Sequence, residues 1–201
     1  MIPRHLRTIA CELSNRENTC RLELVCPCGC KEFHIYVNRY TPKEQAEIDA
    51  WNEAMKREIG CGYAIEGVRQ PDGTIRHWRL IFPGIKREIF PPDPPLSMNI
   101  EVLKVRCAGC DGEHLVFDSR YHGYDGTLCA EEIRAYTPTF VQRRFRDSKP
   151  RRVELTLEYE GGMGEMEGSD PDAIADAFDW ITVHAVSADG KRTKILDSET
   201  A

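Results

Sequence analysis

The stretch Leu22–Tyr40 reads LELVCPCGCKEFHIYVNRY and places three cysteines, Cys26, Cys28 and Cys30, on alternate residues between two segments in which apolar and polar residues alternate. Such alternation is typical of half-buried β-strands, and the Pro and Gly between the segments indicate a tight turn. Cysteine side chains held this close together are most often metal ligands or redox groups. The stretch therefore predicts two strands joined by a cysteine-bearing turn, and that turn is a candidate half of a metal site.

A second stretch, LKVRCAGCDGEHLVFDSRY at Leu103–Tyr121, aligns with the first without gaps and is identical to it at five of the 19 positions. In this alignment Cys107 falls under Cys26, and the apolar residues alternate in the same register. Because both stretches carry a cysteine turn between two predicted strands, we interpret them as an internal repeat. The expected unit is a β-hairpin that occurs twice.

The two cysteine turns resemble those of the zinc-ribbon family, and the resemblance is limited to the turns and their flanking strands. In that family each turn carries C-x-x-C, often followed by Gly, and two turns hold one zinc ion through four thiolates. Cys107 and Cys110 match this spacing, whereas the first turn offers Cys26 with either Cys28 or Cys30. We favour Cys28, because Gly29 follows it. The resemblance implies one structural zinc ion. Four thiolates can also hold iron. The alternative without a metal is a pair of buried or redox-active cysteine clusters.

The composition permits a sizeable core, since 41% of the residues are hydrophobic. No stretch has the length of a membrane span, and the first residues lack the apolar segment of a secretory signal. We therefore expect a cytoplasmic protein, in which thiols stay reduced and clustered cysteines are ligands rather than disulfides. The odd number of cysteines, nine, agrees with this expectation.

Charge is unevenly distributed along the chain: residues 153–201 hold 12 of the 33 acidic residues but only 3 of the 27 basic ones. We predict an α+β fold with a zinc-ribbon domain at 1–152, built on pseudo-repeated β-hairpins, and an acidic unit at 153–201, either separate or packed with the first as one domain. A long insertion at 41–95 should contain a helix that begins with a capping box of Thr41 and Glu44, and a hairpin that turns at Pro71–Gly73. The C-terminal unit should have the order strand, helix, strand, strand, with the last turn at Asp189-Gly190. Its first strand is indicated by the alternation of apolar and polar residues from Val153 to Tyr159.

A dense polar cluster follows the second cysteine turn. A histidine near an aspartate can act as a general base and a serine can act as a nucleophile, so a hydrolase-like site is one interpretation of this cluster. The structural interpretation is a strand end followed by a turn. The cluster consists of Asp118, Ser119, Arg120, His122 and Asp125.

The segment 140–152 is basic in an otherwise acidic protein, and Phe140 and Phe145 are interspersed among its cations. Cations that meet phosphates and rings that stack on bases are typical of nucleic-acid binding. The alternatives are that this segment pairs with the protein's own acidic part or is merely solvated. The candidate contacts are Arg143, Arg144, Arg146, Lys149, Arg151 and Arg152.

The sequence favours a non-enzymatic protein in which a structural zinc ion rigidifies a binding or adaptor module for a protein partner. A nucleic-acid-associated protein that uses 140–152 is the first alternative, and a hydrolase-like enzyme centred on Asp118, Ser119 and His122 is the second. No membrane contact is expected.

Overall fold

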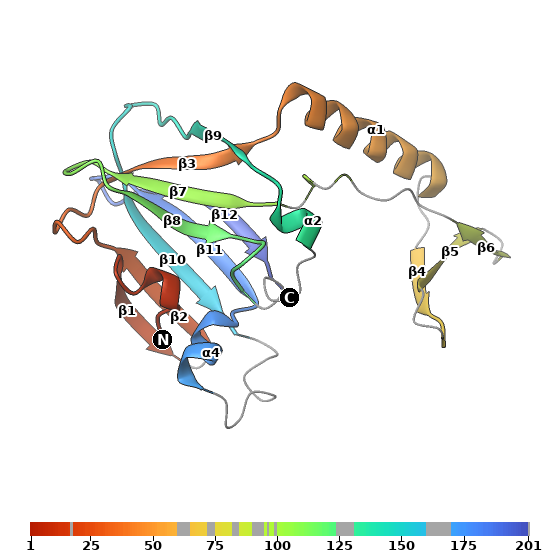
Figure 1. The fold of residues 1–201 in the computed structure, drawn as a ribbon, viewed down its shortest axis with the longest axis horizontal. Helices are drawn as coiled ribbons and strands as arrows, with labels where there is room; N and C mark the ends of the chain where they lie inside the picture. The colour runs from red at the N-terminus through yellow and green to blue at the C-terminus, as the bar shows by residue number, and fades with distance from the viewer. Residues whose placement is uncertain are drawn as a thin grey trace. The chain divides into compact units, whose positions relative to one another are not determined.

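The computed structural model describes residues 1–16, 18–59, 65–71, 75–81, 85–89, 95, 97–98, 100–123, 131–159 and 170–200. The chain divides into two compact units: Met1–Arg39 together with Asn99–Ala201 form the first, and Tyr40–Met98 form the second. No helix in these described ranges combines the length and apolar character that a membrane span requires. The chain is mixed but largely β, as Figure 1 shows.

The first unit contains a five-stranded antiparallel sheet in the order β1-β2-β10-β11-β12. The predicted alternation at Val153–Tyr159 is confirmed, because every second residue of this segment is buried. The hairpin between β11 and β12 turns at Asp189-Gly190, where Gly190 adopts a φ of 83°. The bounds are β1 Ala10–Arg16, β2 Thr19–Leu24, β10 Arg152–Glu158, β11 Trp180–Val186 and β12 Arg192–Glu199.

The first unit also contains a four-stranded antiparallel sheet in the order β8-β7-β3-β9. Strand β9 extends the edge of β3, with Tyr36 opposite Gln142 and Asn38 opposite Phe140. Among the residues that the structure describes, three short helices accompany the two sheets: η1 Arg4–Leu6, α2 Glu131–Arg134 and α4 Pro171–Asp176. The bounds of the strands are β3 Phe33–Arg39, β7 Val102–Cys107, β8 Glu113–Asp118 and β9 Thr139–Gln142.

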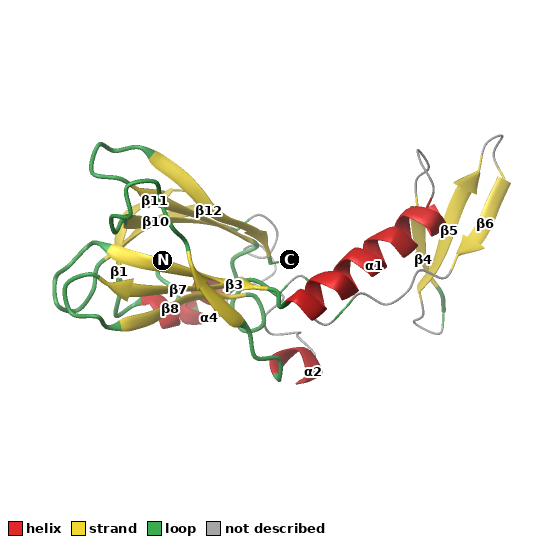
Figure 2. Cartoon of the chain, turned by 90° about the horizontal axis from the view of Figure 1, so that it is seen from above, coloured by secondary structure: helices red, strands yellow, loops and turns green. Residues whose placement is uncertain are grey.

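One hydrophobic core joins the two sheets, which face each other in Figures 1 and 2. Side chains on alternate strand positions point into it, so each sheet has one buried and one more exposed face. Core residues of the five-stranded sheet include Leu22, Leu155 and Val183, and those of the four-stranded sheet include Ile35 and Val105.

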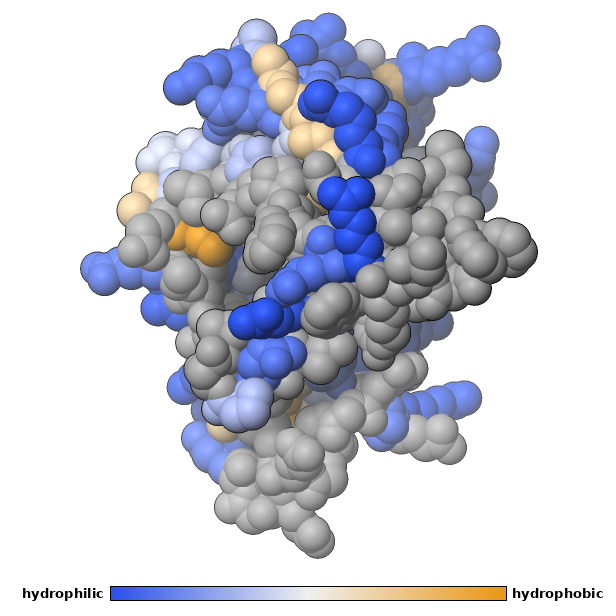
Figure 3. Space-filling model, turned by 90° about the vertical axis from the view of Figure 1, so that its right-hand side faces the viewer, coloured by the Kyte–Doolittle hydropathy of each residue, from blue (hydrophilic) through white to orange (hydrophobic). Residues whose placement is uncertain are grey.

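The second unit begins with α1 Pro42–Ile59, whose start is a capping box. The Thr41 N–H donates to Glu44 Oε2 at 2.6 Å, and the Glu44 N–H donates to Thr41 Oγ1 at 3.3 Å, as the sequence predicts. A three-stranded sheet in the order β4-β5-β6 follows, and residues 72 and 73 of the predicted turn lie outside the described residues. Its strands are β4 Ile65–Arg69, β5 Ile75–Ile81 and β6 Ile85–Ile89. On the face drawn in Figure 3, the described residues are mostly hydrophilic and apolar side chains form only small separate patches.

The repeat does not produce two equivalent hairpins, which corrects one part of the predicted fold. Strands β7 and β8 pair with each other, but β2 and β3 lie in different sheets. The reason is that both edges of β2 are occupied, by β1 on one side and by β10 on the other. Strand β3 instead pairs with β7, with Ile35 opposite Val105.

The acidic C-terminal part has the predicted order β10, α4, β11, β12, and β10 pairs directly with β2. Asp170 caps α4, since its side chain accepts from the Asp172 N–H at 3.2 Å. Two acids of α4 form ion pairs with the N-terminal segment: Asp172 with Arg7, and Asp176 with Arg4 at 2.5 Å.

Candidate metal centre

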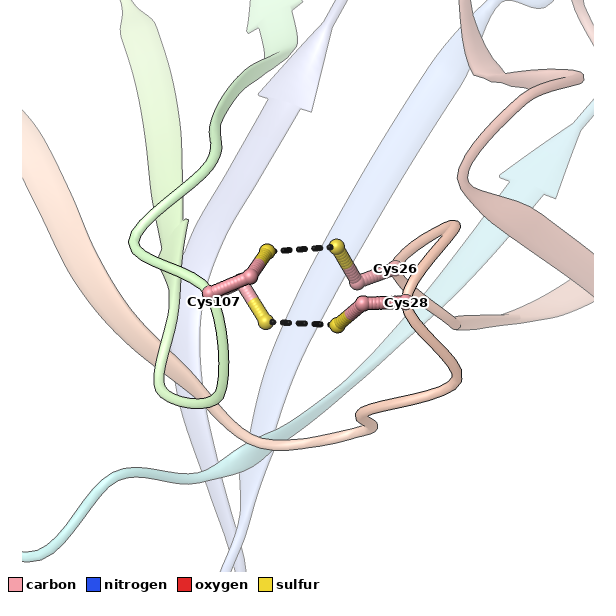
Figure 4. A group of neighbouring side chains, drawn as sticks. Cys26, Cys28 and Cys107 are labelled. Atoms are coloured by element: carbon pink, nitrogen blue, oxygen red, sulfur yellow. Dashed lines mark hydrogen bonds between the residues drawn. The ribbon is translucent and has the colours of Figure 1, made fainter.

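Two tight turns bring four cysteines together. Cys26 lies two residues beyond the end of β2, in the five-stranded sheet, and Cys107 is the last residue of β7, in the four-stranded sheet. The sulfur atoms of Cys26, Cys28, Cys107 and Cys110 all lie within 4.8 Å of one another. In Figure 4, Cys26 and Cys28 point from the first turn toward Cys107 on the second. The cluster therefore connects the ends of strands from different sheets.

Backbone hydrogen bonds shape the first turn. The Gly29 N–H donates to the Cys26 carbonyl at 2.7 Å, and the Cys26 N–H donates to the Cys30 carbonyl at 2.8 Å. Gly29 adopts a φ of 87°, a left-handed conformation that glycine reaches without steric cost. This closed turn directs the Cys26 and Cys28 side chains to the same place.

The second turn is built in a similar way and is tied to the first. The Asp111 N–H donates to the Cys107 carbonyl at 3.0 Å, and the Cys107 N–H donates to the Gly112 carbonyl at 2.9 Å. The Ala108 N–H donates to the carbonyl of Glu32, which lies just after the first turn, at 2.9 Å. This cross-link helps to hold the two turns face to face.

Sulfur–sulfur distances fit a metal ion better than disulfides. Cys26 Sγ lies 3.5 Å from Cys110 Sγ, and Cys28 Sγ lies 3.5 Å from Cys107 Sγ. A disulfide needs about 2.05 Å. A tetrahedral ion with metal–sulfur bonds of about 2.3 Å separates its sulfurs by about 3.8 Å. The four sulfurs therefore lie where they could hold a metal ion as four thiolates.

The electrostatics of the thiols differ within the cluster. Burial raises the pKa of Cys107, but N–H groups of Gly109 and Cys110 and the neighbouring thiols outweigh it and lower that pKa to about 6. At Cys26, a backbone hydrogen bond from Cys28 lowers the pKa, while burial and the Cys110 thiol raise it to about 12. The N–H donors around Cys107 thus favour its thiolate, which is the form of cysteine that binds a metal ion.

Cys30, the rival to Cys28, is not a member of the four-sulfur group. Its Sγ accepts from the Glu32 N–H at 3.4 Å. A Cβ atom at Gly109 would lie 3.2 Å from Cys30 Cβ, so Cys30 packs against the backbone of the opposite turn. Cys11, an isolated exposed cysteine on β1, lies elsewhere in the five-stranded sheet.

His114 is a neighbour of the cluster that sequence reasoning missed. Its Nε2 lies 3.5 Å from Cys26 Sγ. In the repeat alignment His114 falls under Phe33, so no pattern marks it as part of the site. An imidazole N–H at this position can donate to the Cys26 thiolate and disperse its charge.

The side chains of the polar cluster after the second turn form hydrogen bonds within the protein. The Arg120 guanidinium donates to Asp118 Oδ1 at 2.8 Å and to Oδ2 at 2.6 Å, and both side chains are buried. Ser119 Oγ accepts from the Glu101 N–H at 3.0 Å. His122 Nδ1 accepts from the Asp118 N–H at 3.0 Å. These contacts engage the three proposed catalytic groups separately, and Asp125 lies outside the described residues.

The basic stretch divides into two sets of residues. Arg151 and Arg152 pair within the protein, with Asp147 at 2.5 Å and with Glu23 at 3.1 Å. The other four cations are exposed, and among the described residues none of them forms an ion pair with a carboxylate. These four are Arg143, Arg144, Arg146 and Lys149.

In comparisons of the chain with protein-family models, curated proteins and solved structures, no match was found. A four-cysteine cluster with the geometry of a metal site is the functional feature that the structure itself shows.

Proposed function

We propose that this protein is a non-enzymatic binding module whose fold is held together by one structural zinc ion at Cys26, Cys28, Cys107 and Cys110. The observation that carries the proposal is the approach of these four sulfurs to within 4.8 Å of one another from two turns on different sheets. Four thiolates complete a tetrahedral shell and leave no position for substrate or water, so the ion has a structural role.

The binding energy of a structural zinc ion is comparable to the stability of a whole domain. A structural zinc ion contributes roughly 10–16 kcal/mol of apparent binding free energy, and the net stability of a domain is only about 5–15 kcal/mol. The cluster links β2 to β7 across the two sheets. Removing the ion should therefore destabilise the whole first unit rather than one loop.

Contacts around Asp118 favour this function over a hydrolase. A general base must lie within hydrogen-bond reach of its nucleophile. The Nδ1 atom of His122 and the hydroxyl oxygen of Ser119 each accept from a backbone N–H, and Asp118 holds the buried Arg120. The contacts of the polar cluster are therefore those of a strand end followed by a turn, which is its structural interpretation.

Metal content measured by elemental mass analysis tests the proposal, on wild type and on Cys28→Ser, Cys30→Ser, Cys110→Ser and Cys11→Ser. We expect about one zinc per chain in wild type, because one four-thiolate site is filled. The ion should be lost in the Cys28 and Cys110 variants and kept in the Cys30 and Cys11 variants. A strong chelator should lower the melting temperature of wild type.

Each other result has a definite meaning. Metal-free wild type purified without chelator would overturn the proposal. Iron in place of zinc would overturn the choice of ion, and loss of metal in Cys30→Ser with retention in Cys28→Ser would exchange the ligands. Cys11→Ser is the matched control because it removes a thiol outside the cluster.

A further inference from the structure

We propose that the loop of residues 143–149, defined here as the basic loop, binds the phosphodiester backbone of single-stranded nucleic acid. The assignment rests on the proposed function, because it names the partner of the same non-enzymatic module. It replaces the protein partner that the sequence favours.

The basic loop is anchored at both ends to the same edge of β3. At its start, the Arg143 N–H donates to the Ile35 carbonyl at 2.8 Å. At its end, Phe33 and Arg151 exchange two backbone hydrogen bonds, of 2.8 and 2.9 Å. The chain thus leaves the sheet edge at Ile35 and returns to it two residues away at Phe33, so the loop must bulge outward.

A buried arginine fixes the inside of the bulge. Arg151, only 8% exposed, donates to Asp147 Oδ1 at 2.5 Å and to the Lys149 carbonyl at 3.2 Å. Its guanidinium also lies over the Phe145 ring, 4.6 Å from the centroid. These contacts hold the loop in one shape before any ligand arrives, which lowers the entropic cost of binding.

The same contacts leave the loop strongly positive. Asp147 is the only acidic residue in 140–152, and Arg151 already neutralises it. Two acids of the five-stranded sheet are engaged by other cations: Glu23 pairs with Lys31 and Arg152, and Glu154 pairs with Arg21 and Arg192. The exposed cations of the basic loop are therefore available for an external anion.

A hollow of about 200 Å³ lies between the basic loop and β3. Cations and neutral hydrogen-bonding groups both line it, and this is the combination that phosphate oxygens accept from. The polar residues that line the hollow are His34, Gln142, Arg143, Arg144, Ser148 and Lys149.

Two further cations, Lys104 and Arg106, lie on the outer face of the four-stranded sheet, where Arg106 also forms an exposed ion pair with Asp111 at 3.7 Å. Arg106 lies opposite His34, and Lys104 lies opposite Tyr36, so all four share the face that borders the hollow. Lys104 Nζ lies 4.3 Å from the centre of the Phe140 ring. Because this ring is covered by the protein's own cation, contact with phosphates rather than base stacking should dominate, and binding should be tolerant of sequence.

A chain of regularly spaced phosphates fits this arrangement better than an isolated anion. One phosphate can occupy the hollow while its neighbours meet Lys104 and Arg106 along the sheet face. The hollow is of the size of one small group and does not accommodate a duplex, so a flexible single strand is the form that can place a phosphate there.

Fluorescence anisotropy with a labelled single-stranded oligonucleotide of mixed sequence tests the proposal on the full, metal-loaded chain. We expect binding that weakens steeply as salt increases. Arg143→Ala/Arg144→Ala/Lys149→Ala should weaken it about tenfold or more. That variant should also reduce the slope of log affinity against log salt by about 2, since each lost phosphate contact on a single strand accounts for about 0.7.

The matched control is Lys43→Ala/Lys56→Ala/Arg57→Ala, which removes three exposed cations from α1 and changes the net charge equally. Absence of binding, affinity that does not depend on salt, or an equal loss in the control would overturn the proposal. Equal binding of a polyglutamate peptide would also overturn it, in favour of an acidic protein partner. Zinc content and melting temperature are measured on the same samples, so a wild type without zinc refutes the proposed function, whereas zinc-loaded protein that binds no oligonucleotide refutes only this inference.

Discussion

His122 and His5 form a stacked pair, with ring centroids 3.6 Å apart and planes within 8° of parallel. Burial, then the neighbouring His5, lowers the pKa of His122 to about 4, and burial also lowers the pKa of His5. A histidine in the unfolded chain has a pKa near ~6.5. Between these two pKa values, His122 is protonated in the unfolded chain but neutral in the folded chain. The contribution of this histidine to stability is therefore present above pH ~6.5 and is lost as the pH falls toward 4.

We therefore expect the free energy of unfolding to fall between pH 6.5 and 4.5, with roughly 2–3 kcal/mol of the fall coming from His122. Urea denaturation at the two pH values measures it. His122→Gln should reduce the fall by that amount, whereas His34→Gln, which changes a histidine on the outer sheet face, should leave it unchanged. Acid release of metal affects all three proteins alike, and equal falls in all three would contradict the prediction.

Arg120 is a second residue whose contacts define its role. Its side chain is 8% exposed and that of its partner Asp118 is 5% exposed. It also donates to the carbonyls of Arg134 and Tyr136, which connects β8 to the segment around α2. A buried charge that loses its partner keeps its desolvation cost, so breaking such a pair is strongly destabilising.

Arg120→Met should lower the free energy of unfolding by about 3 kcal/mol or more, because Asp118 is left buried and unpaired. Urea denaturation at neutral pH measures the loss. Arg4→Met is the control, since it breaks the exposed pair with Asp176 and should cost about 1 kcal/mol or less. Similar losses in the two variants would show that the burial of the Asp118 pair does not matter.

At the scale of elements, the sequence predicted those features that depend on neighbouring residues: a helix start, the buried face of a strand and the cysteine turns. The capping box at Thr41 and Glu44 is intact, and the alternation from Val153 to Tyr159 matches the buried face of β10. The cysteine turns also form as expected, because a turn is determined by a few neighbouring residues.

Strand partners could not be predicted in the same way. The repeat suggested that the segments on either side of Cys26 pair as those around Cys107 do, yet β2 pairs with β1 and β10. Alternation shows which face of a strand is buried but not which strand lies beside it. For the same reason His114 and the uncompensated state of the basic loop could not be identified, since both depend on contacts between residues far apart in the sequence.

At the scale of the whole molecule, the second unit is an insertion whose two ends are held together by one side chain. Asn38 Nδ2 donates to the Ile100 carbonyl at 2.6 Å, and Asn38 Oδ1 accepts from the Val102 N–H at 3.0 Å. The chain therefore leaves the four-stranded sheet at β3 and re-enters it at β7, the adjacent strand.

Replacing residues 41–98 by a flexible linker of about six residues should leave the first unit folded and loaded with metal, because so short a linker spans neighbouring strands. Circular dichroism and zinc content measure this outcome. As a control, the same shortened chain with Cys110→Ser should lose its metal. A shortened chain that is unfolded or free of metal, beside a zinc-loaded full chain, would show that the second unit supports the first.

Strand β2 and its partner β10 lie far apart in the chain, so they become available at different times during synthesis. Cys26 and Cys28 emerge from the ribosome with β2, and the four sulfurs of the cluster are complete once residue 110 has emerged. Of the two strands that pair with β2, β1 is made before it, whereas β10 is made after the cluster is complete because it begins at Arg152. The four cysteines are thus all present in the nascent chain while one edge of β2 is still unpaired. A metal ion bound at that stage would hold β2 against β7 and reduce aggregation of the partly synthesised chain until β10 is made.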